Sequence, residues 1–295
     1  MAEDFLVVEG RRIAVHRWGA VEGAAASVLC LASTGLSGLQ WRRLGKLLAR
    51  RGFCVLAPDL LGYGESDDWR GPEPFTTARD VEVAAAVLAT CPGSLHLVGH
   101  SYGGRVALRL GLQLTAAQRA RLRSLALFEP TSFGVLRSSA ALGQLGQDGI
   151  DELEAYDRDG RFLADDFGGS EPWLARFVDY WSGPGTWAEL DDEARAPWLR
   201  SARKIFEEVR ETALDDVPHQ AYVEALGALP LLLLAGGEST LAGRRCCEVL
   251  ARHWHPGLVE LQVFADVGHM APVLAPGEVA ARIATHLDDA RPPIG

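Results

Sequence analysis

Short apolar runs and amphipathic segments alternate along most of the chain. The apolar runs are nearly continuous, which is typical of strands that are covered on both faces in a parallel sheet. The segments between them repeat apolar residues every three to four positions, and this spacing favours helices. The strand-like runs occupy residues 27–33, 52–60, 94–101, 122–130, 228–237 and 258–269. Strand and helix in alternation predict an α/β fold with a mostly parallel, doubly wound sheet.

Two parts of the chain depart from this alternation. Residues 4–19 switch between apolar and polar positions around a turn at Gly10, which predicts an antiparallel hairpin at an edge of the sheet. Over residues 131–218 the strand-like runs disappear, and the chain is helical, polar and rich in tryptophan. We therefore expect one core domain, formed by residues 1–130 and 219–295, that carries residues 131–218 as a helical cap.

The composition indicates a soluble globular protein with an acidic surface. The chain has 295 residues, of which 48% are hydrophobic and 23% charged, and its formal net charge is −10. This charge argues against nucleic acid or an anionic membrane as the main partner. We found no basic region followed by an apolar one at the start, and no apolar run approaches the roughly 18 residues that span a bilayer.

The cysteines help to predict the compartment. Their number is odd, and their spacing matches no disulfide framework or metal-ligand pattern. Together with the absence of a recognisable leader, this predicts a cytoplasmic protein without disulfides or a metal site. The five cysteines are Cys30, Cys54, Cys91, Cys246 and Cys247.

The strongest chemical signal is the motif G-x-S-x-G, formed by Gly99, Ser101 and Gly103. A serine at a sharp turn from strand to helix takes a strained backbone conformation, and flanking glycines let neighbouring backbone pass close to it. The turn exposes the hydroxyl above the sheet edge. It also aims the N–H of Tyr102, at the start of the next helix, toward an oxyanion. Ser101 is therefore our candidate nucleophile.

His269 is the candidate base. In folds with this serine turn the catalytic order along the chain is serine, acid and histidine. His269 follows the last strand-like run, so it should lie at the same edge of the sheet as Ser101. The other histidines lie in the hairpin, within a strand, in or beside helices, or, for His219, at a position suited to capping or the surface. His100 precedes the nucleophile, but the alternation of a strand points its side chain away.

Three motifs together resemble the α/β-hydrolase fold family over nearly the whole chain. They are "GHSYGG" at residues 99–104, "VGHM" at 267–270, and "DLLGYGES" at 59–66, which fits the family pattern D-x-x-G-x-G-x-S. The resemblance implies the family's sheet with a helical cap, and a serine hydrolase that needs no cofactor. It also implies an architectural role for Asp59.

One departure from the family concerns the oxyanion hole. The family's first parallel strand usually ends in His-Gly, and the next residue supplies an N–H to the hole. Here Thr34 stands where the histidine is expected, and Gly35 is kept. By this resemblance Leu36 is expected to be the second donor beside Tyr102.

The other departure concerns the acid. The family commonly places an aspartate three residues beyond a glycine in the loop after the next-to-last strand, where this chain has Ser239 or Thr240. Haloalkane dehalogenases instead place the acid after the preceding parallel strand, and that position is Glu129. We therefore expect Glu129 to orient His269, with Glu238 as the alternative acid, and a dyad or another carboxylate as the third option.

The aromatic residues of the cap are expected mainly to form its own small core. A few of them should line an apolar substrate pocket above Ser101. The three candidates are Trp181, Trp187 and Phe133.

The expected reaction is hydrolysis of an ester, thioester or lactone of a small apolar metabolite through an acyl-enzyme. A serine nucleophile speaks against dehalogenase or epoxide hydrolase chemistry, in which a carboxylate attacks carbon. Carbon–carbon bond hydrolysis, cofactor-free perhydrolysis of the haloperoxidase type, and a small-molecule receptor with a vestigial triad remain alternatives. The expected partner is a small-molecule substrate, and a homodimer stays open.

Overall fold

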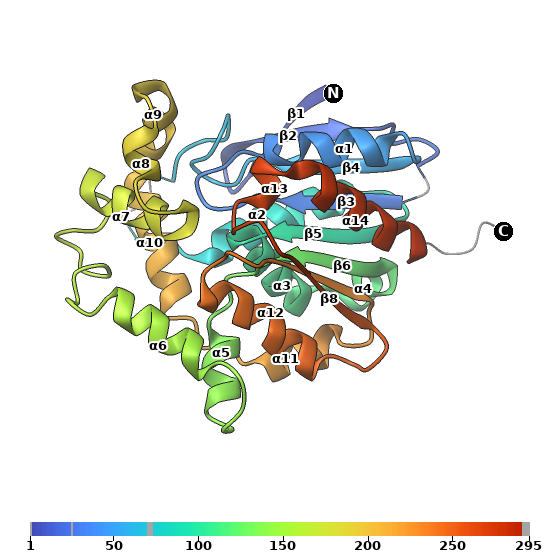
Figure 1. Ribbon diagram of the computed structural model, residues 1–295. Helices are drawn as coiled ribbons and strands as arrows, with labels where there is room; N and C mark the ends of the chain where they lie inside the picture. Colours follow the sequence, from blue (N-terminus) through green and yellow to red (C-terminus); the bar gives the residue numbers. More distant parts are fainter. Residues whose placement is uncertain (1, 25, 70–72, 291–295) are drawn as a thin grey trace.

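The computed structural model describes residues 2–24, 26–69 and 73–290 of the chain. Its strands are β1 (Ala2–Val8), β2 (Arg11–Trp18), β3 (Ala26–Leu31), β4 (Phe53–Pro58), β5 (Ser94–His100), β6 (Leu122–Phe128), β7 (Leu231–Gly236) and β8 (Val259–Phe264). Within these described residues they form one sheet in the order β1-β2-β4-β3-β5-β6-β7-β8 (Figure 1). β1 and β2 pair antiparallel, β2 is antiparallel to β4, and the other neighbours are parallel. The predicted edge hairpin and mostly parallel sheet are confirmed.

The interior strands are apolar throughout because helices cover both faces of the sheet. In β3, Leu29 and Leu31 contribute to one apolar core, whereas Val28 and Cys30 contribute to the other. The first core contains α2, α3, α11 and α12, and the second contains α1 and α14. The helices outside the cap are η1 (Gly38–Trp41), α1 (Arg42–Ala49), α2 (Thr77–Thr90), α3 (Tyr102–Gln113), α4 (Ala116–Arg121), α11 (His219–Leu226), α12 (Leu241–His253), α13 (Ala271–Leu274) and α14 (Pro276–Asp289).

β8 is shorter than the predicted strand at residues 258–269, because the chain turns away after Phe264. The N–H of Gly237 donates to Phe264 O at 2.7 Å, and the N–H of Glu238 donates to Val267 O at 3.0 Å. These bonds tie the loop after β7 to the loop after β8. His269 consequently sits in a loop that is fastened to the sheet edge.

Helices between β6 and α11 form the segment expected to be the cap, and they lie together beside the sheet (Figure 1). Aromatic stacking provides much of their core: the Trp173 ring stacks on Phe162 and Phe177, with centroids 5.2 and 5.6 Å apart. The status of residues 131–218 as a separate domain stays a prediction. The helices are α5 (Gly134–Ala140), α6 (Gln147–Tyr156), α7 (Glu171–Ser182), α8 (Thr186–Glu189), α9 (Asp192–Arg200) and α10 (Ala202–Ala213).

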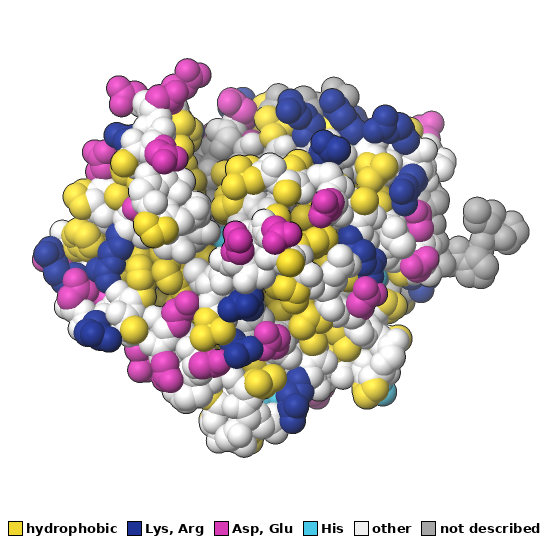
Figure 2. All heavy atoms as spheres, in the orientation of Figure 1, with side chains coloured by type: hydrophobic (Ala, Val, Ile, Leu, Met, Phe, Trp, Pro, Cys, Tyr) yellow, Lys and Arg dark blue, Asp and Glu magenta, His cyan; other side chains and the backbone are white. Residues whose placement is uncertain are grey.

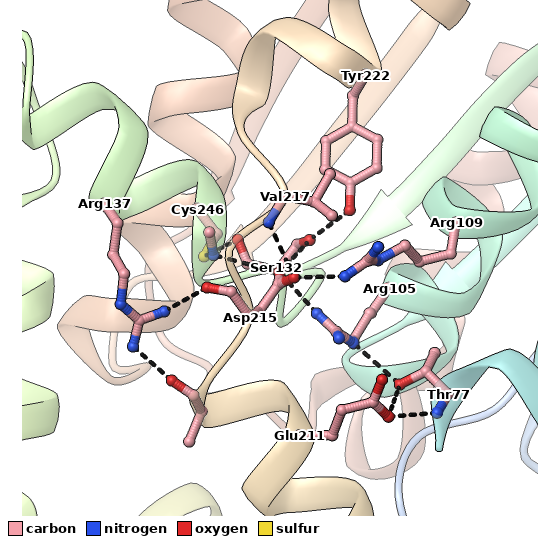
Figure 3. Close-up of polar contacts among 12 residues, drawn as sticks. Thr77, Arg105, Arg109, Ser132, Arg137, Glu211, Asp215, Val217, Tyr222 and Cys246 are labelled. Carbon is pink, nitrogen blue, oxygen red and sulfur yellow. Dashed lines mark hydrogen bonds and ion pairs between the residues drawn. The ribbon is translucent and has the colours of Figure 1, made fainter.

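Asp215 fastens the two ends of the cap to α3 (Figure 3). Its buried carboxylate pairs with Arg105 and Arg109, each at 2.6 Å. The same carboxylate accepts hydrogen bonds from Ser132 Oγ at 3.1 Å and from the N–H of Gly134 at 3.2 Å. The entry to the cap, its exit and the helix after Ser101 therefore meet at one side chain. We call Asp215 with Arg105, Arg109, Ser132 and Gly134 the Asp215 cluster.

Charged side chains of both signs are interspersed over the molecular face shown in Figure 2, and basic side chains gather over α1. Within the described residues, no helix combines the length and the apolar character needed to cross a membrane. All five cysteines are buried and free.

Candidate active site

Ser101 occupies the sharp turn between β5 and α3. Its backbone angles, φ 55° and ψ −120°, lie in a region that side-chain-bearing residues rarely adopt. The flanking glycines are required by space: a Cβ at Gly99 would lie 2.6 Å from the Cα of Gly104, and one at Gly103 would lie 2.2 Å from Leu31 O. The strained turn expected from the G-x-S-x-G motif is therefore present, and its serine is only 4% exposed.

Glu129 lies directly after β6, the strand beside β5, and it contacts His269. One carboxylate oxygen, Oε1, accepts a hydrogen bond from the N–H of Gly236 at 2.7 Å, and the other, Oε2, is 2.6 Å from Nδ1 of His269. Both side chains are buried. Because the carboxylate oxygen accepts, Nδ1 donates its proton and Nε2 keeps a free lone pair. This is the tautomer that a general base requires.

His100 holds the backbone of His269, a role that our sequence analysis did not assign to it. Its Nε2–H donates to His269 O at 2.9 Å, and its Nδ1 accepts from the side-chain amide of Gln40 at 3.0 Å. Burial, and secondarily the nearby His269, lower the pKa of His100 well below its usual range. His100 is therefore neutral. A signal was present in the sequence, since His100 adjoins the nucleophile.

Ser101 and His269 share neighbouring residues but make no direct hydrogen bond. Among the described residues, no hydrogen bond joins Ser101 Oγ to the imidazole. The ring of His100, the residue before Ser101, lies 4.9 Å from that of His269, and the Trp181 ring lies 4.2 Å from it (centroid distances). Trp181 and Ser101 line the same cavity. Catalytic hydrogen bonds are often long or poorly aligned without substrate and tighten when it binds.

A cavity of about 430 Å³ separates Ser101 from the cap helices. Phe133 and Trp181, two of the three predicted pocket residues, line it. Trp187 does not. It is buried within the cap, its backbone N–H donates to Asp179, and the guanidinium of Arg195 lies over its ring. Because α8 directs Trp187 into the cap itself, its prediction as a pocket residue is wrong.

The wall of this cavity is mainly apolar, with charged groups at its outer end. The exposed side chains of Glu154 and Arg158 lie there. Arg137 also borders the cavity, but its guanidinium donates to Asp215 O at 2.7 Å. The apolar wall residues are Phe133, Ile150, Leu153, Phe162, Leu163, Phe177, Trp181, Val209, Ala213 and Leu214.

The oxyanion donors differ in part from the expectation. The N–H of Leu36 donates to Ser33 O at 3.1 Å, so it closes a turn and is not a free donor. Thr34, which takes the place of the family histidine, lines the cavity with Ser101. Within the described part of the chain, no hydrogen-bond acceptor is found for the N–H groups of Thr34 and Tyr102. The structure thus favours Thr34 over Leu36, which a motif comparison could not distinguish.

The alternative acid, Glu238, does not reach His269. Its side chain is exposed, while its backbone N–H is used in the loop pairing described above. Across residues 2–24, 26–69 and 73–290, no group of three or more histidine, cysteine or acidic side chains could hold a metal ion.

Asp59 joins several loops beneath the cavity. Its buried carboxylate accepts from Nε2 of His16 at 2.9 Å, from the N–H of Gly38 at 2.7 Å and from the N–H of Glu65 at 2.8 Å. These contacts agree with the architectural role expected for it.

Comparison with known proteins gives a family and several relatives. A model of the Alpha/beta hydrolase family matches residues 28–282. Lipase LipV of Mycobacterium tuberculosis is 35% identical over 117 residues, which are 39% of this chain and 41% of that lipase. The uncharacterized protein Rv2715 of the same organism is 33% identical over 110 residues, 37% of this chain and 30% of the relative. The chain therefore matches less than half the length of these curated relatives.

Solved structures resemble the whole chain in fold. A thermophilic esterase from Thermogutta terrifontis superposes with a TM-score of 0.66 at 19% identity, covering 99% of this chain and 100% of the esterase. A hydrolase from Pseudomonas aeruginosa PA01 gives a TM-score of 0.68 at 22% identity, covering 97% and 98%. At such identities the likeness concerns the fold. With the family model matched over most of its length, the chain belongs to the alpha/beta hydrolase family.

Proposed function

We propose that the chain is a serine hydrolase that cleaves an ester, thioester or lactone of a small, apolar substrate. The observation that carries the proposal is the buried bond between Glu129 and His269, beside a cavity that Ser101 lines from a strained turn. The esterase and the lipase among its relatives support the same class of reaction. The apolar wall favours an apolar acyl group in the cavity.

In the proposed reaction, Ser101 Oγ attacks the carbonyl carbon while its proton passes to Nε2 of His269. The electron pair of the C=O bond moves onto its oxygen, where the N–H groups of Tyr102 and Thr34 stabilise the charge. The imidazolium then protonates the leaving alcohol or thiol as its bond to carbon breaks, and an acyl-serine remains. Water, deprotonated by His269, attacks the acyl group, releases the carboxylic acid and restores the serine. Glu129 holds the imidazole in its reactive tautomer throughout.

Activity and labelling of Ser101 test the proposal directly. We expect a fluorophosphonate to modify the chain stoichiometrically and to inactivate it, and Ser101→Ala to abolish both labelling and turnover of p-nitrophenyl esters. A series of acyl-chain lengths, with lactones beside them, measures which acyl group the cavity accepts. An unreactive chain that still binds apolar ligands would instead indicate a receptor.

Two matched carboxylate variants test the acid. Glu129→Gln should lower kcat by about 10³- to 10⁴-fold, because the amide no longer favours the Nδ1–H tautomer. Glu238→Gln changes an exposed carboxylate of the neighbouring loop and should leave kcat within about twofold of the parent. A large loss in the second variant with none in the first would overturn the assignment of Glu129.

A further inference from the structure

Two charged residues of the cap helix α10 are buried in the joint between cap and core. Lys204 and Glu208 lie one helical turn apart, and their side chains are 4% and 0% exposed. They pair with each other, and Lys204 Nζ also lies 3.1 Å from Oδ2 of Asp80 in α2. The ammonium group sits 3.9 Å from the ring centroid of Tyr63 and 4.4 Å from that of Phe75. These contacts replace the water that each charge loses on burial.

Each carboxylate of this group also holds a residue of the core. Glu208 Oε1 accepts a hydrogen bond from Oγ1 of Thr34 at 2.5 Å. Asp80 Oδ2 accepts one from the hydroxyl of Tyr102 at 3.0 Å. A continuous path of polar contacts therefore runs from Thr34 through the cap to Tyr102. We call Thr34, Tyr63, Asp80, Tyr102, Lys204 and Glu208 the Lys204 cluster.

The ends of this path coincide with the two proposed oxyanion donors. Tyr102 follows the nucleophile and opens α3, and Thr34 lines the cavity in place of the family histidine. The hydroxyl of Thr34 makes one hydrogen bond among the described residues, and this bond reaches the cap. A cluster that only fastened the cap would not need both of its ends at the oxyanion site.

We propose that the Lys204 cluster positions the oxyanion donors, so that Lys204 and Glu208 are positioning residues of the cap for the reaction in the core. This inference rests on the proposed function. Oxyanion donors act through placement, because a preorganised N–H contributes most when it does not reorient as charge develops. The hydrogen bond from Thr34 to Glu208 and the preceding strand β3 together hold the turn that carries the Thr34 N–H. The cap thereby completes the oxyanion hole without contacting the substrate carbonyl.

Thr34→Val and Thr34→Ser form the central test. Valine keeps the shape of threonine and removes the hydroxyl, whereas serine keeps the hydroxyl. We expect Thr34→Val to lower kcat about tenfold and to leave KM within about twofold, because the donor acts mainly on the transition state. Thr34→Ser should restore most of the loss. Tyr102→Phe, which breaks the other end of the path, should lower kcat in the same way.

Ser201→Ala, at the residue immediately before α10, is the matched control. Ser201 Oγ donates to Gly62 O and so joins cap to core without a hydrogen bond to Thr34 or Tyr102. This variant should lose cap stability and keep kcat. A second readout is affinity for a boronic acid that mimics the tetrahedral intermediate, which should weaken in Thr34→Val and Tyr102→Phe alone.

The outcomes separate this inference from the proposed function. If fluorophosphonate labels Ser101 in the parent and in all variants, while Thr34→Val keeps the parent kcat and boronate affinity, positioning by the cluster is wrong and the hydrolase stands. Equal losses of kcat in Thr34→Val and Ser201→Ala would also overturn it, since loosening of the cap would explain both. An unlabelled, inactive parent would overturn the proposed function itself.

Discussion

Two buried charge clusters join the cap to the core, and they do so in different places. The Asp215 cluster gathers the entry and exit of the cap onto α3, with one carboxylate shared by two guanidinium groups and several backbone or hydroxyl donors (Figure 3). The Lys204 cluster lies at the middle of α10 and has one ammonium between two carboxylates. The first holds the ends of an insertion together, whereas the second ends on residues beside the nucleophile.

The difference shows that burial and charge alone do not reveal what an ionic cluster does. Asp215 and Arg105 are nearly inaccessible to water, as are Lys204 and Glu208, and removing one partner leaves a buried charge unpaired. Their contacts separate them. Asp215 contacts groups that fix the path of the chain, so its loss should appear in stability. Thr34 and Tyr102 carry the N–H groups that we propose for the oxyanion hole, so loss of their contacts should appear in kcat.

Among the variants that compare the two clusters, the largest expected effect is on stability. Asp215→Ala should lower the free energy of unfolding by about 3–5 kcal/mol, because Arg105 remains buried without its carboxylate. The kcat of the folded fraction, counted by fluorophosphonate titration, should stay within about twofold of the parent. Chemical denaturation measures the first quantity. Asp216→Ala, at the exposed neighbouring position, serves as control and should change neither. A tenfold loss of kcat in Asp215→Ala at full folding would erase the distinction between the clusters.

The next largest effect is expected in the energetic coupling between pairs of substitutions, measured in kcat/KM. Thr34→Val and Tyr102→Phe break one path at its two ends, so their losses in kcat/KM should be non-additive by about 1 kcal/mol. Thr34→Val and Asp215→Ala share no hydrogen-bond partner, and their effects should add within about 0.5 kcal/mol. Double-mutant cycles of kcat/KM measure both pairs. Additivity in the first pair would show that the Lys204 cluster does not act as a unit.

A smaller effect on the free energy of unfolding is expected from His100, which is neutral and donates a hydrogen bond to His269 O. The lowered pKa of His100 means that the folded state stays neutral where the unfolded chain takes up a proton. Below about pH 6.5 the unfolding free energy should therefore fall as pH falls, by at most about 1.4 kcal/mol per pH unit for this group. His100→Gln should reduce that slope. His219, His253 and His286 also have lowered pKa values and leave a residual slope of the same sign.

Unfolding followed from pH 7 to pH 5 gives this slope for each variant. His255→Gln, which changes an exposed histidine, is the comparison and should leave the slope intact. If the slope of His100→Gln equals that of the parent, the neutral contact between His100 and His269 does not contribute to the pH dependence.

Periodicity predicted the layered fold because burial on both faces of a sheet leaves few choices of residue. The interior strands form at the predicted apolar runs, and the hairpin forms at the sheet edge. Glu129 was predicted as the acid through the family comparison, and the structure brings it to His269. Its role in catalysis stays a proposal until the variants are measured.

Other features depend on contacts that a sequence pattern does not contain. Lys204 and Glu208 are four residues apart, which is the spacing of an ordinary exposed ion pair on a helix, and only the docking of α10 buries them. Trp187 was equally suited by type to a pocket and to the cap's interior. The choice between Leu36 and Thr34 depends on one turn bond to Ser33. These features depend on tertiary contacts, which composition and residue spacing do not determine.

The anchoring of the cap affects how substrate enters the cavity and how product leaves it. Swinging the cap open would separate Lys204 from Asp80, and Asp215 from Arg105 and Arg109. Such a separation is costly in the interior of a protein. Entry and exit are then left to the outer end of the cavity, where Glu154 and Arg158 stand. We therefore expect rotation of side chains at this end of the cavity, and no opening of the cap, to admit substrate.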